Sequence, residues 1–316
     1  MPVGVISHLP NVSFEQVRAL ARAAEAAGAD WLGLPDAFWW RDTWLLLAEA
    51  ARVTERIEIG PLVTNPYLRH PFHTVAAVAS LQDLAGRRVF VGIGAGGSEV
   101  TGVAGISRRD APERVGALAA LLRTIAMDGR SLDPASGRAL EVPLHPAPIL
   151  IGGRANGMLT AAGRWADRAL LWAVPASDLA RSAALIASGA RAGREADGPA
   201  PELVWAPLVD YGGQTRQRVQ TIAAYSVLNS RPEVQARWGL DRASIDRLRK
   251  VLVGGGAAAA QDFVPAVALD DLILNDPAPA RVAVLARKLG AASLAVPAFS
   301  IEEVGQRVAW AREVLA

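Results

Sequence analysis

Short apolar runs alternate with helix-like segments along the whole chain, and this alternation limits the folds that the sequence can adopt. The pattern is clearest in residues 57–97, where the apolar runs Ile57–Leu62 and Val89–Ile93 enclose one amphipathic helix. Each run ends in a polar or glycine-rich turn, and the order of strand, helix and strand is typical of a βαβ unit. The strands are apolar and the turns that follow them carry polar atoms. This arrangement is typical of a barrel enzyme, whose active site lies apart from its core.

Eight such runs, each followed by a helical pattern, predict the architecture. No run alternates polar and apolar residues as a half-exposed strand does, so we expect a parallel sheet covered by helices. The count favours an α/β fold, a (β/α)8 TIM barrel with insertions, with an open doubly wound sheet as the alternative. The expected strands are Val3–Ser7, Trp31–Leu34, Ile57–Leu62, Val89–Ile93, Ile149–Ile151, Ala169–Ala173, Leu203–Val209 and Ser293–Val296.

The length of the chain bears on its domain organisation. A barrel of this kind needs roughly 250 residues, and the chain has 316. We therefore expect residues 1–316 to form a single barrel domain with insertions at about 128–147 and 226–277. The second insertion contains the glycine- and alanine-rich run 254–260, which we expect to be flexible.

Composition excludes several classes of function. The 33 basic and 31 acidic residues leave a formal net charge of +2, and the arginines are scattered over helix faces, so we expect no nucleic-acid partner. The absence of cysteine excludes disulfides and thiolate chemistry, and the four histidines lack carboxylates at ligand spacing, so we expect no metal. No apolar stretch reaches the roughly 18 residues of a membrane span. The N-terminus lacks the pattern of a signal peptide, so we expect a cytoplasmic protein without a membrane partner.

Two residues that follow the first strands are candidates for proton transfer. Asp36 follows the second strand and is surrounded by the aromatic residues 38–40, where desolvation would raise its proton affinity and suit it to acid or base catalysis. Its alternative role is to cap the helix that begins near Thr43. His8 follows the first strand and could hydrogen-bond a substrate carbonyl or donate a proton. Its alternative role is structural.

The turns after the third and fourth strands could bind a flat ring. Val63–Pro66 could direct main-chain N–H and C=O groups into the barrel mouth, unless it is an ordinary loop. Residues 92–99 match a dinucleotide fingerprint weakly, because we expect the next helix only at Arg109–Met127. Glycines there would instead let a flat ring approach the backbone. The candidate residues are Val63, Thr64, Asn65, Gly94, Ala95, Gly96 and Gly97.

The fifth strand runs through Gly152, Gly153 and Arg154 directly into a helix. Free N–H groups at the start of a helix, together with one guanidinium, suit a phosphate. The alternative is a glycine turn with a surface arginine.

Large aromatic side chains also fall at strand ends. The chain has nine tryptophans, which is many for its length. Those at strand ends could form the wall of a pocket for a planar ligand or substrate. We therefore expect a substrate pocket formed by Trp39, Trp40, Trp172 and Phe299.

Four segments resemble a known family: GADWLGLPD (28–36), RIEIGPLVTNPYLRHP (56–71), LQDLAGRRVFVGIGAGG (81–97) and GMLTAAGRWAD (157–167). They are similar to the luciferase-like flavin and deazaflavin monooxygenase superfamily, and to its branch of F420-dependent methylene-tetrahydromethanopterin reductase-like proteins. The resemblance spans essentially the whole chain. It implies a reductase or dehydrogenase that passes a hydride between coenzyme F420 and a small organic substrate, such as a biosynthetic intermediate. It also implies a homodimer.

The same resemblance implies roles for individual residues. The third strand would end in a bulge with a non-proline cis peptide near Val63–Asn65, backing the ring, while Gly94–Gly97 would border it. The loop that opens at Gly152 and includes Met158 would hold the phosphate.

Two positions depart from the family pattern. Asp36 is followed by Ala37 where many relatives have histidine, and 155–158 read Ala-Asn-Gly-Met where relatives often read Gly-Pro-Lys-Met. Arg154 would then replace the lysine. The alternatives are a monooxygenase that uses reduced FMN on the same barrel, and a cofactor-binding barrel without catalysis.

Overall fold

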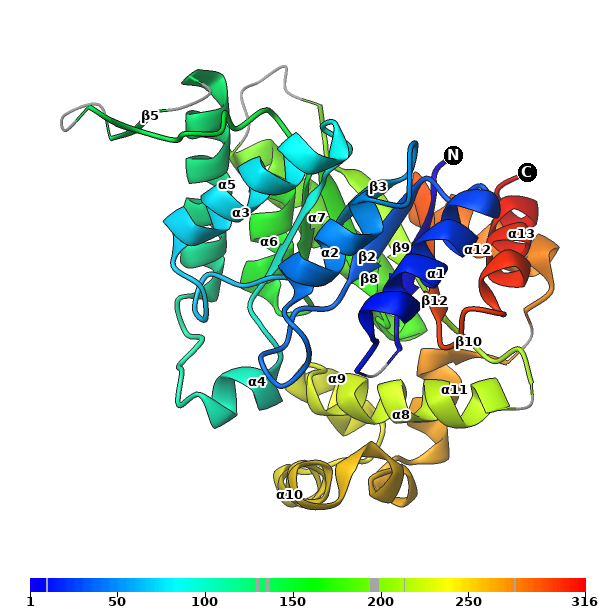
Figure 1. Ribbon diagram of the computed structural model, residues 1–316. Coiled ribbons are helices and arrows are strands. Elements are labelled where there is room, and N and C mark those ends of the chain that lie inside the picture. The colour runs from blue at the N-terminus through cyan, green and yellow to red at the C-terminus, as the bar shows by residue number, and fades with distance from the viewer. Residues whose placement is uncertain (10, 129–130, 134–136, 194–198, 213, 276) are drawn as a thin grey trace.

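Eight parallel strands form one closed sheet in the computed structural model, which describes residues 1–9, 11–128, 131–133, 137–193, 199–212, 214–275 and 277–316 (Figure 1). The order around the barrel is β3-β2-β1-β12-β9-β8-β7-β4. Parallel bridges from Ile59 to Val89 and from Thr64 to Ile93 join the segments of β3 and β4, the two ends of this order. They close the sheet, so the predicted (β/α)8 barrel is confirmed. The barrel strands are β1 (Val3–Ser7), β2 (Trp31–Leu34), β3 (Glu58–Pro61), β4 (Val91–Gly94), β7 (Ile149–Gly152), β8 (Arg168–Trp172), β9 (Glu202–Ala206) and β12 (Ser293–Ala298).

Helices surround this sheet, and local sequence signals fix where several of them begin. Ser13 and Gln16 form a reciprocal capping box at the start of α1. His70 caps α3, and Pro71 occupies the first turn, where its missing N–H costs no hydrogen bond. None of the helices within the described ranges is long and apolar enough to cross a bilayer. The outer helices are α1 (Phe14–Ala26), α2 (Thr43–Ala51), α3 (Pro71–Ala85), α5 (Ala111–Asp128), α6 (Asn156–Trp165), α7 (Ala176–Gly193), α12 (Pro279–Leu289) and α13 (Val304–Leu315).

Large aromatic rings fill the barrel interior. The rings of Trp31 and Phe90 meet edge to face with centroids 5.5 Å apart. They fit because small residues face them: a Cβ on Gly4 would lie 2.0 Å from the Trp31 ring, and one on Gly60 would lie 2.2 Å from the Phe90 carbonyl oxygen. The interior is thus a packed apolar core, and polar chemistry is left to the strand ends.

The seventh expected strand, Leu203–Val209, is in fact two strands. β9 stays in the barrel, whereas β10 (Leu208–Val209) leaves it to pair with β11 (Ile273–Leu274). Pro207 separates the two, because proline has no N–H to continue the barrel ladder.

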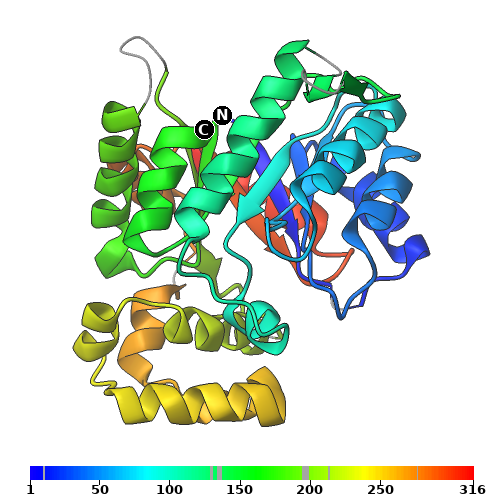
Figure 2. The ribbon, with the colours of Figure 1, turned by 90° about the vertical axis from the view of Figure 1, so that its left-hand side faces the viewer.

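Additional elements lie at both ends of the barrel (Figures 1 and 2). The strands β5 (Ser131–Asp133) and β6 (Arg138–Ala139) pair at the amino end. The run 254–260, expected to be flexible, lies largely within α10, which has a kink at Gly256 with φ of 75° and ψ of 178°. The elements at the carboxyl end, which have a hydrophobic core of their own, are α8 (Gln214–Leu228), α9 (Pro232–Arg237), α10 (Arg242–Ala259), a short 3-10 helix (Gln261–Phe263) and α11 (Ala266–Leu272).

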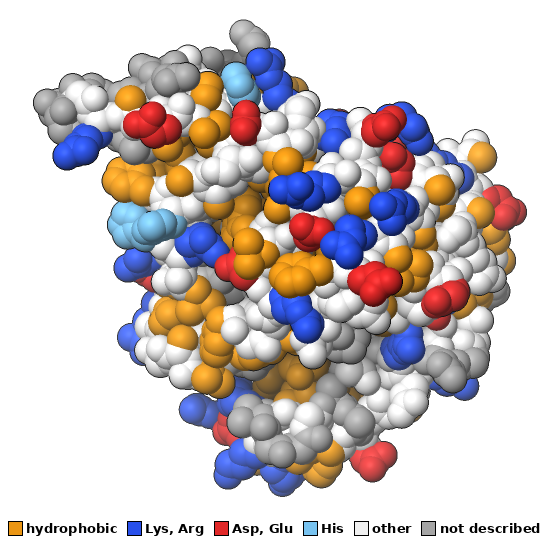
Figure 3. Space-filling view, viewed as in Figure 1, with side chains coloured by type: hydrophobic (Ala, Val, Ile, Leu, Met, Phe, Trp, Pro, Cys, Tyr) orange, Lys and Arg blue, Asp and Glu red, His pale blue; other side chains and the backbone are white. Residues whose placement is uncertain are grey.

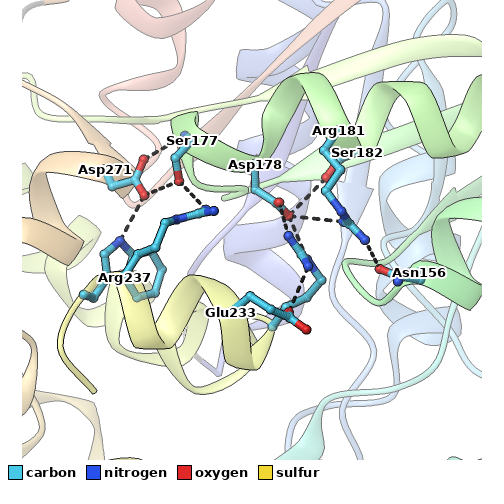
Figure 4. A network of polar contacts seen from close by, with 10 residues as sticks. Asn156, Ser177, Asp178, Arg181, Ser182, Glu233, Arg237 and Asp271 are labelled. Carbon is cyan, nitrogen blue, oxygen red and sulfur yellow. Dashed lines mark hydrogen bonds and ion pairs between the residues drawn. The ribbon is translucent and has the colours of Figure 1, made fainter. Parts of the chain in front are cut away.

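A polar network joins these carboxyl-end helices to the barrel (Figure 4). Asp178, in the first turn of α7, is 5% exposed, and one carboxylate oxygen lies 2.5 Å from the guanidinium of Arg231. Arg181 lies 3.7 Å from the same carboxylate and also donates to Asn156 at the start of α6. Asp271 on α11 accepts hydrogen bonds from Ser177, at 2.6 and 2.8 Å. Helices α6, α7, α9 and α11 are therefore linked at one place.

We expect Gly163→Ala to destabilise the protein by about 1–3 kcal/mol or more through overpacking. Gly163 on α6 faces α7 so closely that a Cβ would lie 2.0 Å from the carbonyl oxygen of Ile186, a backbone atom that cannot move alone. Gly305→Ala in α13 is the matched control, because nothing lies within 4 Å of its added Cβ. Helix propensity should make that control more stable by roughly 0.5–1 kcal/mol. Urea unfolding measures both variants, and equal midpoints would contradict the close packing.

Candidate active site

Asp36 lies at the end of β2 and is half-buried at the barrel mouth. Its carboxylate accepts a hydrogen bond of 2.7 Å from the hydroxyl of Thr64, which follows β3. Desolvation raises the pKa of Asp36, and the bond from Thr64 opposes that shift only in part. The alternative role as a helix cap is excluded, because Asp42 accepts from the backbone N–H of Trp44 and caps α2.

His8 lies on the neighbouring strand end, between two aromatic rings. Its imidazole stacks on Trp172 with centroids 5.1 Å apart and contacts Phe299 at 5.7 Å. Desolvation lowers the pKa of His8 to about 4. The ring is therefore neutral near pH 7, where it can donate or accept a hydrogen bond but carries no proton to give as an acid.

Two arginines hold the aromatic wall in place. Arg154 donates to the carbonyl oxygen of Trp172 at 3.0 and 3.2 Å, and Arg218 donates to that of Phe299 at 2.7 Å. Figure 3 shows the surface hollowed between the barrel and the helices below it, with hydrophobic side chains inside the hollow. Two of the four residues expected to form the substrate pocket, Trp172 and Phe299, therefore meet around His8.

Trp39 and Trp40 are more peripheral. Both lie in the loop after β2, where Trp39 is 45% exposed and packs edge to face on Phe38 at 5.0 Å. Trp40 is half-buried. These two side chains therefore lie in a loop near the mouth, apart from the ring contacts that Trp172 and Phe299 make with His8.

The turn after β3 is tied to β4 by its backbone. The N–H of Thr64 donates to Gly92 and the N–H of Gly94 donates to Thr64, both at 2.9 Å. The non-proline cis peptide lies between Leu62 and Val63, one residue before the expected segment. The Val63 side chain faces Gly94, where a Cβ would lie only 2.5 Å from it.

Asn65 completes this turn. Its side chain is buried, and its carbonyl oxygen accepts from the N–H groups of Tyr67 and Leu68 at 3.1 and 3.0 Å. Asn65 therefore shapes the loop, and its side chain also lies beside Gly96, where a Cβ would be 3.6 Å from it.

The glycine turn 94–97 leads directly into a short helix, α4 (Ser98–Val103). We expected no helix before residue 109, and that expectation is wrong; the longer helix α5 begins at Ala111. Gly96 has φ of 74°, a left-handed conformation that favours glycine, and its carbonyl oxygen accepts a 2.7 Å bond from Arg108. Ala95 and Gly97 on either side are half-buried.

The start of α6 offers unused donors. Ala155 occupies the N-cap position and supplies no side-chain acceptor, so N–H groups of the first turn are available to a bound anion. Gly153 lies against Met158, where a Cβ would be 2.6 Å from that side chain. Gly152 has room by comparison, since its nearest neighbour would be 3.5 Å away.

Arg154 makes contacts that the sequence did not predict. Besides the carbonyl of Trp172, its guanidinium bonds the hydroxyl of Ser226 on α8 at 3.1 Å. These bonds direct it to the mouth wall and to the carboxyl-end helices. The cation that contacts the first turn of α6 is instead Arg181, through Asn156.

Sequence reasoning missed several residues around the mouth. Arg108, Arg181, Arg218 and Ser226 all contact segments far from them in the chain. Only Arg108 had a local signal, because it begins the charged run 108–110 shortly after the glycine turn.

Comparison with known proteins bears on this arrangement. The sequence profile described as luciferase-like monooxygenase matches residues 2–284. This chain belongs to that family.

Similar proteins cover most of the chain. It is 26% identical over 255 residues to 5,10-methylenetetrahydromethanopterin reductase of Archaeoglobus fulgidus, covering 78% of this chain and 76% of that protein. It is 29% identical over 212 residues to F420-dependent hydroxymycolic acid dehydrogenase of Mycobacterium tuberculosis, covering 61% and 59%. The coenzyme F420-dependent tetrahydromethanopterin reductase of Methanopyrus kandleri superimposes with a TM-score of 0.75 at 22% identity, covering 96% of this chain and 97% of that one. The family member thus has the fold of that reductase.

Proposed function

We propose that this protein is an F420-dependent oxidoreductase that transfers a hydride between the deazaflavin and a small organic substrate. The observation that carries the proposal is the likeness along the barrel to a reductase and a dehydrogenase whose names specify F420. Two features of the mouth support such a group. The start of α6 has donors without a side-chain cap, and Val63 packs against Gly94, the first residue of the glycine turn 94–97.

The residues at the mouth would divide the binding of this cofactor. Main-chain groups of Val63, Thr64 and Asn65 and the turn Gly94–Gly97 would border the ring. Gly152, Gly153 and Met158, with the first N–H groups of α6, would hold the phosphate. When bound, the deazaflavin supplies a site that gives or accepts a hydride. Arg154 would act indirectly, by fixing Trp172, rather than as the main phosphate ligand.

Asp36 is the better of the two candidates for handling a proton. Its pKa is raised, so it exchanges a proton closer to neutral pH than an ordinary carboxyl does. His8, with a pKa of about 4, would orient the substrate by a hydrogen bond. Trp172 and Phe299, with Trp39 and Trp40 nearer the solvent, would exclude water from the reacting atoms.

Titration of the purified protein with F420 and separately with FMN tests the proposal. We expect F420 to bind, with a change in its fluorescence and without oxygen uptake in the presence of substrate. Binding of FMN only, with oxygen consumption when the reduced form is supplied, would replace the proposal with a luciferase-like monooxygenase. Binding of neither would overturn both.

The assembly and location expected from the sequence belong to the same proposal. We infer a homodimer in the cytoplasm acting on a small-molecule substrate. Size-exclusion chromatography with light scattering tests the dimer, and a mass of one chain, 33.2 kDa, would contradict it.

A further inference from the structure

A cleft of about 480 Å³ lies beside the barrel mouth, outside the residues assigned so far. It is lined by Tyr67, Ile106, Ser107, Arg109, Asp110 and Arg114. Tyr67 comes from the loop after β3, residues 106–110 from the segment between α4 and α5, and Arg114 from the first turn of α5. The cleft is therefore built by the chain that follows the two ring-bordering turns.

The cleft carries a surplus of positive charge. The charge of Asp110 is balanced by Arg114 at 2.5 Å, and its other carboxylate oxygen accepts a hydrogen bond of 3.0 Å from the hydroxyl of Tyr67. The pKa of Asp110 is lowered by its bond with Arg114, and that of Tyr67 is raised to about 12, so the phenol stays protonated. Arg109 has no acceptor within the described ranges of the chain. One guanidinium is thus left for an anionic ligand.

Two residues next to the cleft lining in the chain, Arg108 and Pro112, contact the two parts of the proposed cofactor site. Arg108 donates to Gly96 of the glycine turn, which ties one side of the cleft to the ring-bordering backbone. On the other side, Pro112 lies next to Gly157 in the first turn of α6, where a Cβ would be 2.8 Å from the proline ring. A ligand whose ring lies on the glycine turn and whose phosphate reaches the start of α6 could extend further groups into this cleft.

We propose that the cleft binds the glutamate carboxylates that coenzyme F420 carries beyond its phosphate, with Arg109 as the principal contact. The inference rests on the proposed function. FMN ends at its phosphate and has no such group, so the cleft would also favour one cofactor over the other. Since Arg109 is exposed, its contribution is that of a solvent-screened ion pair, and it should weaken with salt.

The test compares F420 with its form that lacks the glutamates, by fluorescence titration of the purified protein. We expect the wild type to bind full F420 more tightly than the shortened form. Arg109→Gln should weaken binding of full F420 by about two- to fivefold and leave the shortened form unchanged. Arg109→Glu should weaken it further, most at low salt. The control is Arg22→Gln, an exposed arginine on α1 without a hydrogen bond or ion pair within the described chain.

The outcomes separate the inference from the function on which it rests. Equal loss of affinity for both forms in Arg109→Gln would place the arginine at the ring or phosphate and overturn the tail site. An unchanged affinity for full F420 would overturn it as well. Failure of the wild type to bind either form would overturn the proposed function itself.

Discussion

Asp36→Asn should lower kcat/KM by about 10²–10⁴-fold, the range expected for loss of a general acid or base. Asparagine keeps the size of the side chain and can still accept the 2.7 Å hydrogen bond from Thr64, so only proton exchange is removed. The measurement follows deazaflavin absorbance with a small carbonyl compound that the wild type reduces. F420 affinity, titrated separately, should be unchanged, because Asp36 is not among the residues assigned to the ring or phosphate.

The pH dependence of the wild type has a sign that depends on the direction of the reaction. The pKa of Asp36 is raised by burial. If Asp36 donates a proton during substrate reduction, activity falls as pH rises through the raised pKa. If it accepts a proton during substrate oxidation, activity falls as pH drops through that same value. Asp36→Asn should remove this limb of the profile, and a variant that retains it would show that another group is responsible.

The stability of Asp36→Asn shows whether a loss of activity comes from misfolding. A carboxyl whose pKa is raised in the folded state favours folding fully below its unfolded pKa, and this contribution is lost as pH rises through the folded pKa. Above the unfolded pKa, the raised pKa of the half-buried Asp36 therefore opposes folding. Asp36→Asn should be at least as stable as the wild type at pH 7. Unfolding at lower urea would mean that lost activity reflects misfolding rather than lost chemistry.

The barrel could be predicted from the sequence because its signals are local. Each strand is an apolar run with its own flanking turn, and the helix starts are marked by Ser13 and by the His70–Pro71 pair. Strands with no polar alternation identify a sheet covered on its outside. The strand bounds that were least accurate involve Pro207, where one apolar run serves two sheets.

The candidate site was less predictable because its contacts join distant segments. Asp36 was recognised, but its partner Thr64 is 28 residues away and belongs to another strand end. Arg154 looked like a phosphate ligand from its place in the loop. Its contacts with Trp172 and Ser226 depend on how β8 and α8 pack around it, and its phosphate role stays a prediction. Spacing along the chain carries no information on either pair.

Asp178→Ala should destabilise the protein by about 2–4 kcal/mol, somewhat less than the roughly 3–5 kcal/mol that is typical when a buried charge loses every partner. Asp178 and Arg231 are 2.5 Å apart, with side chains 7% and 16% exposed. Removing the carboxylate leaves the guanidinium of Arg231 with Glu233, an exposed side chain 2.9 Å away, and weakens the link between α7 and α9 (Figure 4). Urea unfolding followed by tryptophan fluorescence measures the loss, and Trp238, which donates to Asp271 in the same network, reports on this region.

Asp246→Ala is the matched control for that experiment. Asp246 also pairs with an arginine, Arg249 at 2.6 Å, but the two side chains are 49% and 53% exposed on α10. Water solvates either charge when its partner is removed, so the change should stay below about 1 kcal/mol. Because the two substitutions are chemically identical, the difference between their losses of stability measures the effect of burial. Similar small losses in both variants would mean that the helices at the carboxyl end are held by their apolar contacts, with the buried ion pair adding little.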